Sequence, residues 1–122
     1  MEELKLGTVE SKFADIIWEN EPISSGQLVK LCGKQLDWKK STTYTMLKRL
    51  CERGLFQNEK GMVSALMTKE EFGAAQSEKI IEESFDGSLP AFIAAFTSRK
   101  KLSPDDVNEI QKMIDSYRVE GE

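Results

Sequence analysis

Three short helical patterns follow one another within the first 53 residues, and their closeness limits the possible fold more than any other feature. The first pattern begins at Thr8, a predicted N-cap, and ends near Asn20, because Pro22 keeps the residue before it out of helical geometry. Apolar residues recur three or four positions apart in each pattern: Val9, Phe13, Ile16 and Ile17, then Leu28, Leu31, Cys32 and Leu36, and then Met46, Leu47, Leu50 and Cys51. This spacing predicts three amphipathic helices.

The second and third helices carry their own boundary signals. Ser24 or Ser25 is predicted to begin the second helix, and the third is predicted to run from about Lys40 to Arg53. Gly54 stands where a residue in the left-handed conformation would end the third helix. Three short helices joined by tight turns predict a helix-turn-helix.

The pattern changes after the third helix. Two short runs, residues 55–58 and 62–67, flank the tripeptide Glu59-Lys60-Gly61, and a glycine-containing turn between two such runs predicts a β-hairpin. A hairpin in this position is the wing of a winged helix-turn-helix. We therefore expect a mainly α fold with a small β-wing, in which residues 1–68 form a winged-helix DNA-binding domain.

Residues 69–122 return to helical spacing. A fourth helix is predicted from Lys69 to a stop at Gly87, a short fifth helix follows, and Ser103-Pro104 marks the start of a sixth. The segment has many large apolar side chains for its length, which favours a helical dimerisation domain with candidate contacts at Ile81, Phe85, Leu89, Phe92, Ile93, Phe96, Val107, Ile110 and Ile114. The alternative is that these side chains pack against residues 1–68 of the same chain.

The composition disfavours several kinds of chemistry. The chain has no histidine and only two cysteines, Cys32 and Cys51, so we expect neither a metal site nor a histidine-based triad. No glycine-rich phosphate loop is present, and we expect no cofactor and no enzymatic activity. Both cysteines fall on apolar faces, which favours buried thiols over a redox sensor.

The expected compartment is the cytoplasm. No apolar run approaches the roughly 18 residues that a membrane span needs, so direct membrane insertion is not expected. The first residues also lack the apolar core of a secretion signal.

Charge is distributed unevenly, although the total is −4. Residues 1–68 contain ten Lys/Arg and nine Asp/Glu, whereas residues 69–122 contain seven and twelve. The third helix is basic, and its pairing with the second would place it in the major groove of DNA. The predicted DNA-binding residues are Lys39, Lys40, Ser41, Thr42, Tyr44, Thr45, Lys48, Arg49 and Lys60.

Each of these residues also has a purely structural explanation. The threonines and basic side chains can form an ordinary solvated helix face, and Tyr44 can pack at the edge of the helix. Arg49 can pair with a guanine or hold a phosphate, and the sequence leaves both roles open.

Four segments of the chain resemble the penicillinase repressor (BlaI/MecI/CopY) family. The third-helix segment is similar to the family's recognition-helix motif T-x-x-T-x-L-x-R-L-x-x-[KR]-G. The other three segments match the family's first helix, the turn between two tail helices and the start of the last helix. In order, the four are Leu6-Gly7-Thr8-Val9-Glu10 with Ile16-Ile17-Trp18, Thr42 to Leu50 with Arg53-Gly54, Phe85-Asp86-Gly87-Ser88-Leu89, and Leu102-Ser103.

The resemblance implies a homodimer that represses genes from a pseudo-palindromic operator, with control of antibiotic-resistance or stress genes. In some members a membrane-bound sensor protease triggers cleavage of an Asn-Phe bond in the tail. The matching bond here is Ala95-Phe96, in which Phe is retained and Ala replaces Asn. Copper-responsive members carry a C-terminal cysteine cluster, which this chain lacks after Cys51.

Two functions of different classes follow from the sequence. The first is a dimeric transcriptional repressor that binds double-stranded DNA through the winged helix. The second is a winged-helix protein–protein interaction module without sequence-specific DNA binding, which the acidic total charge favours slightly.

Overall fold

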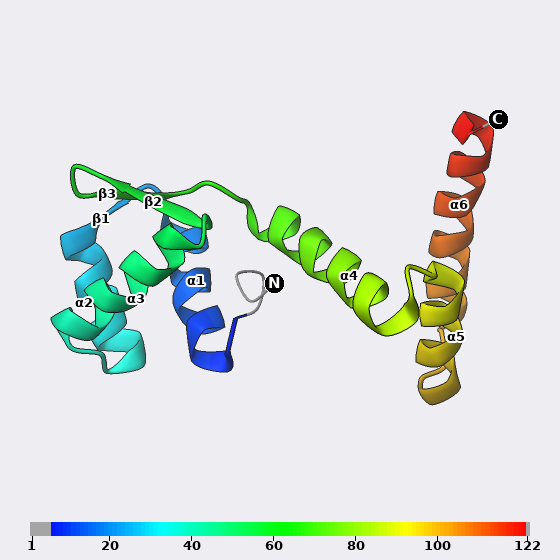
Figure 1. The fold of residues 1–122 in the computed structure, drawn as a ribbon, viewed down its shortest axis with the longest axis horizontal. Helices are drawn as coiled ribbons and strands as arrows, with labels where there is room; N and C mark the ends of the chain where they lie inside the picture. Colours follow the sequence, from blue (N-terminus) through cyan, green and yellow to red (C-terminus); the bar gives the residue numbers. More distant parts are fainter. Residues whose placement is uncertain (1–5, 122) are drawn as a thin grey trace. The chain divides into compact units, whose positions relative to one another are not determined.

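The computed structural model describes residues 6–121, with side chains described as far as Arg118, as a mainly α-helical chain with a small sheet (Figure 1). Its elements are α1 (Thr8–Asn20), β1 (Ile23–Ser24), α2 (Ser25–Leu36), α3 (Lys40–Glu52), β2 (Phe56–Glu59), β3 (Met62–Ala65), α4 (Lys69–Phe85), α5 (Leu89–Arg99) and α6 (Pro104–Gly121). Contacts group the chain into two compact units, Met1–Lys79 and Ile80–Glu122, called here the head and the tail.

The cap of α1 differs from the sequence expectation. Thr8 lies inside the helix, and the N-cap is Gly7, which has an extended backbone. The N–H of Gly7 donates to Oε1 of Glu10 at 2.9 Å. The prediction of a Thr8 cap was therefore wrong by one residue, because the Gly7 carbonyl already accepts the first helical hydrogen bond, from the Ser11 N–H at 2.8 Å, which places Thr8 inside the helix.

Local signals also set the other helix ends of the head. The Ser24 hydroxyl accepts from the N–H of Gln27 at 3.1 Å and caps α2. Asp37, in the left-handed region, ends α2, and Gly54 with φ of +84° follows α3. Backbone conformation thus separates α2 from α3 and α3 from the strands.

The three strands form one antiparallel sheet in the order β1-β3-β2. β2 and β3 make the predicted wing, and Lys60 and Gly61 form its two-residue turn with positive φ angles of 51° and 84°. Such a turn matches the natural twist of a hairpin. β1 was not predicted, because two residues carry no periodic signal; its pairing with β3, Ile23 with Val63 and Ser24 with Met62, defines it.

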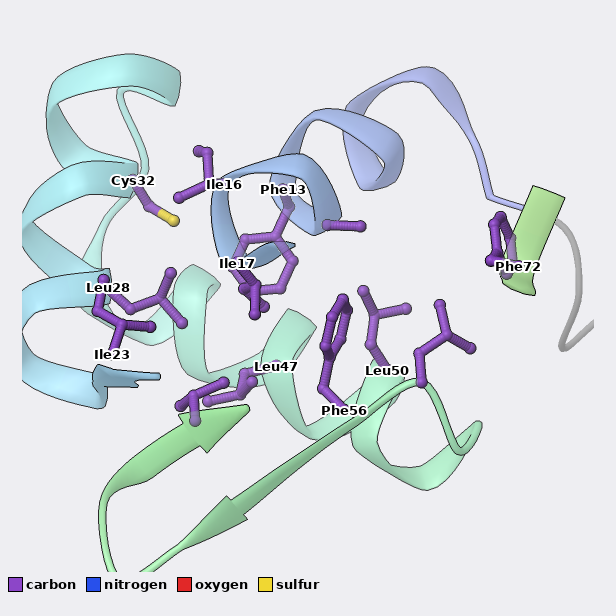
Figure 2. Packing of buried hydrophobic residues seen from close by; sticks show 13 residues of the cluster. Phe13, Ile16, Ile17, Ile23, Leu28, Cys32, Leu47, Leu50, Phe56 and Phe72 are labelled. Carbon is purple, nitrogen blue, oxygen red and sulfur yellow. The ribbon is translucent and has the colours of Figure 1, made fainter. Parts of the chain in front are cut away.

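The core of the head lies where α1, α2, α3 and the hairpin meet (Figure 2). Phe13, Leu28, Leu50 and Phe56 are completely buried, each from a different element. Fully burying a side chain of this kind stabilises the fold by roughly 1.5–3 kcal/mol. The inner face of α3 is thereby fixed against three neighbouring elements.

The start of α4 is packed within the head. The indole Nε1 of Trp18 donates to the Met67 carbonyl at 2.9 Å, and the Trp18 and Phe72 ring centroids are 5.8 Å apart. Lys69 Nζ forms an ion pair with Asp15 at 2.8 Å. These contacts explain why the head extends to Lys79, beyond the wing.

The tail has well-formed helices without a buried core. Ser88 and Ser103 cap α5 and α6 by accepting from the N–H groups of Ala91 and Asp106. No side chain among residues 80–118 is buried. Local capping therefore defines these helices, while their apolar faces remain uncovered within one chain.

We predict that Leu50→Ala destabilises the head by roughly 2–5 kcal/mol, because truncation leaves a cavity at a fully buried position. Urea unfolding followed by tryptophan fluorescence measures this, since Trp18 and Trp38 are the chain's two tryptophans and both lie in the head. Thr45→Ala, on the exposed face of the same helix, should stay within about 0.5 kcal/mol of wild type. Equal losses in both variants would contradict the packing described for α3.

Candidate nucleic-acid interface

The outer face of α3 is polar and accessible. Thr43, Leu47 and Leu50 are buried, so the 100° rotation per residue turns the opposite face toward solvent. The predicted contacts on this exposed face are Ser41, Thr42, Thr45, Lys48 and Arg49. The structure therefore leaves these five side chains open to a ligand that lies along α3.

Tyr44 occupies the edge of α3. It is half-buried, and its hydroxyl donates to the Ser25 hydroxyl oxygen at 3.1 Å. The N–H of Ser25 in turn donates to the Gly61 carbonyl at 2.8 Å. Tyr44 thus ties the helix to the start of α2 and, through Ser25, to the turn of the wing.

Three further predicted contacts are exposed lysines, two at the N-terminus of α3 and one in the turn of the wing. Lys39 is the N-cap residue of α3, Lys40 is its first residue, and both are exposed. The first N–H groups of a helix carry partial positive charge, which adds to the two ammonium groups at this end. Lys60 is exposed at the turn between β2 and β3.

Arg49 and Arg53 share one carboxylate. Nη1 of Arg49 lies 3.6 Å from Glu10 Oε2, and Nη1 of Arg53 lies 3.5 Å from the same oxygen. The sequence did not indicate that Glu10 contacts the third helix. Glu10 is, however, part of the first-helix motif on which the family resemblance rests, and that motif could have directed attention to it.

The tail presents apolar side chains to solvent. Leu89, Ile93 and Phe96 on α5 and Val107 and Ile114 on α6 are 40–54% exposed. The other predicted dimerisation residues, Ile81, Phe85, Phe92 and Ile110, are half-buried. Phe85 and Phe92 meet edge to face with ring centroids 5.5 Å apart.

The bond between Ala95 and Phe96 lies within α5 rather than in a loop. Both residues are exposed, and the Ala95 carbonyl accepts from the Ser98 hydroxyl at 2.7 Å. A protease would therefore reach this bond only after local opening of the helix.

No helix in the described part of the chain combines the length and apolar character needed to cross a membrane.

The three-helix head with its β-hairpin defines the winged-helix class of DNA-binding folds. A family model described as "Penicillinase repressor" matches residues 6–116. The penicillinase repressor of Bacillus licheniformis is 21% identical over 118 residues, covering 93% of this chain and 92% of that protein. The methicillin resistance regulatory protein MecI of Staphylococcus aureus (strain Mu50) is 21% identical over 114 residues, covering 90% and 93%.

The chain therefore belongs to the penicillinase repressor family, as its motifs indicated. Members of this family are transcriptional repressors, so the chain is a DNA-binding repressor and not an enzyme.

We predict that both thiols react slowly in the native protein. Burial raises the pKa of Cys32, and the Thr43 hydrogen bond offsets this only in part; burial and the charge of Glu52 raise the pKa of Cys51. Labelling with a chromogenic disulfide at neutral pH should be slower than in urea, and slower for the fully buried Cys32 than for Cys51.

The same shifts predict how stability depends on pH. Because the folded state favours the protonated thiols, their contribution to the free energy of unfolding is present below the ordinary thiol pKa. It is lost as the pH rises through the pKa values of the folded state.

In the labelling experiment, native protein that reacts as fast as protein in urea would contradict the packing of both cysteine side chains.

Proposed function

We propose that this chain represses transcription as a homodimer that binds a pseudo-palindromic operator, with DNA binding in residues 1–68 and dimerisation in residues 69–122. The observation that carries the proposal is the exposed, hydroxyl- and amine-bearing face of α3 in a chain of the penicillinase repressor family. In a helix-turn-helix this face enters the major groove.

The proposed contacts divide between positioning and reading. Lys39, Lys40 and the N-terminus of α3 bind phosphates, and Lys60 binds the adjacent backbone or minor groove. The face of α3 reads base edges through Ser41, Thr42, Thr45, Lys48 and Arg49. Tyr44 contributes by holding the helix edge, since its hydroxyl is engaged with Ser25.

The proposed dimer covers the apolar faces of the tail. Side chains such as Ile93 and Phe96 are uncovered in one chain, and a second copy would remove them from water. A two-fold dimer presents two heads to two half-sites about 34–36 Å apart, which accounts for a pseudo-palindromic operator.

We further propose control of resistance or stress genes and inactivation by proteolysis in the tail. The names of the relatives, a penicillinase repressor and a methicillin resistance regulator, support the first. The match of Ala95-Phe96 to the family's cleavage position and the exposure of both residues support the second, with a membrane-bound sensor protease as the partner. The site of action is the cytoplasm, where the operator is.

We predict salt-dependent, sequence-selective DNA binding. In a fluorescence-anisotropy titration, the duplex from upstream of its own gene should bind more tightly than a scrambled duplex. With six to ten phosphate contacts, the affinity should fall by roughly 10³–10⁵ between 50 and 200 mM salt. Lys60→Ala should weaken binding to both duplexes and reduce the salt slope by about 1 for each head.

Lys112→Ala, which removes the same charge from α6 in the tail, is the matched control. It should leave the affinity for both duplexes and the salt slope unchanged. Equal binding of the two duplexes with an unchanged salt slope in Lys60→Ala would instead favour the protein–protein module.

We predict that Val107→Glu dissociates the dimer whereas Asn108→Glu does not. The two residues are neighbours on α6 and both are exposed in one chain, so neither change should unfold the helix. Only Val107 belongs to the proposed interface, where a buried, unpaired carboxylate would be costly. Sedimentation velocity at micromolar concentration measures the outcome, and two variants that remain dimeric would place the interface elsewhere.

A further inference from the structure

Glu10 connects the N-terminus of α1 to the recognition face of the head. Its Oε2 lies 3.6 Å from Nη1 of Arg49, in the last turn of α3, and 3.5 Å from Nη1 of Arg53, the C-cap residue of that helix. Its other oxygen, Oε1, accepts the Gly7 N–H at 2.9 Å. Both carboxylate oxygens are therefore engaged, and the cap of α1 sets the orientation of the group.

The two arginines differ in their access to solvent. The side chain of Arg53 is 19% exposed and that of Glu10 is 20% exposed, so these two form the enclosed part of the cluster. The side chain of Arg49 is 55% exposed. A guanidinium has five N–H donors, and the contact with Glu10 uses Nη1, so Arg49 retains donors for a ligand beside α3.

An arginine without such a partner would bind any nearby phosphate. Phosphate contacts supply most of the sequence-independent affinity for DNA, whereas a guanine presents two acceptors at one fixed place. A carboxylate beside Arg49 competes with phosphates that are not held in a fixed position. Exchanging one anion for another at the guanidinium adds little binding free energy. A bidentate guanine contact at the operator can still be made by the remaining donors.

We propose that Glu10 is a positioning residue that reserves Arg49 for the operator and limits its contribution to non-specific DNA binding. The inference rests on the proposed function, since it needs a protein that prefers one DNA sequence. A purely structural tie between α1 and α3 would change stability without changing the preference between two duplexes.

The test is Glu10→Gln, measured by anisotropy with the operator and the scrambled duplex at several salt concentrations. Glutamine keeps an oxygen that can accept from Gly7 but removes the charge that holds Arg49. Affinity for the scrambled duplex should rise about threefold to fivefold per head, the range of a partly exposed ion pair. The slope of log affinity against log salt concentration should steepen by about 1 per head. The ratio of the affinity for the operator to the affinity for the scrambled duplex should fall.

Two comparisons separate this effect from a general gain of positive charge. Glu19→Gln removes the same charge from α1, nine residues and about 14 Å further along the helix. It should leave the ratio nearly unchanged. In an Arg49→Ala background, Glu10→Gln should have no further effect on the ratio, because the residue that it releases is gone.

An unchanged ratio in Glu10→Gln, an equal fall in Glu19→Gln, or the same fall without Arg49 would each overturn the inference. If thermal unfolding shows that Glu10→Gln does not fold, Glu10→Asp shortens the reach to Arg49 while keeping the charge, and the same fall in the ratio is expected. If the wild-type protein prefers neither duplex, the proposed function itself is overturned. If the wild-type protein prefers the operator and Glu10→Gln does not change that preference, only the role of Glu10 is overturned.

Discussion

The burial of the inner face of α3 is the interaction on which the rest of the head depends. Leu47 and Leu50 pack with Phe13 of α1, Leu28 of α2 and Phe56 of β2 in one core (Figure 2). Because a helix turns by 100° per residue, fixing these positions also fixes which residues face solvent. The polar outer face of α3, which we propose contacts DNA, is thus a consequence of apolar packing on the opposite side.

Polar contacts at the two edges of α3 refine this arrangement. Tyr44 donates to Ser25, which also holds the wing turn through Gly61, and Arg49 meets Glu10 on α1. Each contact is weak by itself, since a single hydrogen bond or a partly exposed ion pair contributes little to stability. Their importance lies in geometry, because they relate the helix to the wing and to α1 at the surface where DNA would lie.

The helices of the tail are stabilised differently from those of the head. Its helices are defined locally by caps such as Ser88 and Ser103, yet residues 80–118 include no buried side chain. Helices of this length gain most of their stability from covering an apolar face. The apolar side chains of α5 and α6 that are exposed in one chain are the ones that the proposed dimer would cover, so the proposed assembly would also stabilise the tail.

The sequence by itself determined the order and type of the helices, the wing and the family, because caps, breakers and apolar spacing act over a few residues. Ser24, Gly54 and the Lys60-Gly61 turn are signals of this kind. Only the tertiary structure decided that Ile23 pairs with Val63, that Tyr44 bonds Ser25 and that Glu10 holds Arg49. Those contacts join residues 19 to 40 positions apart, and no local pattern encodes which distant side chains will meet once the core has packed.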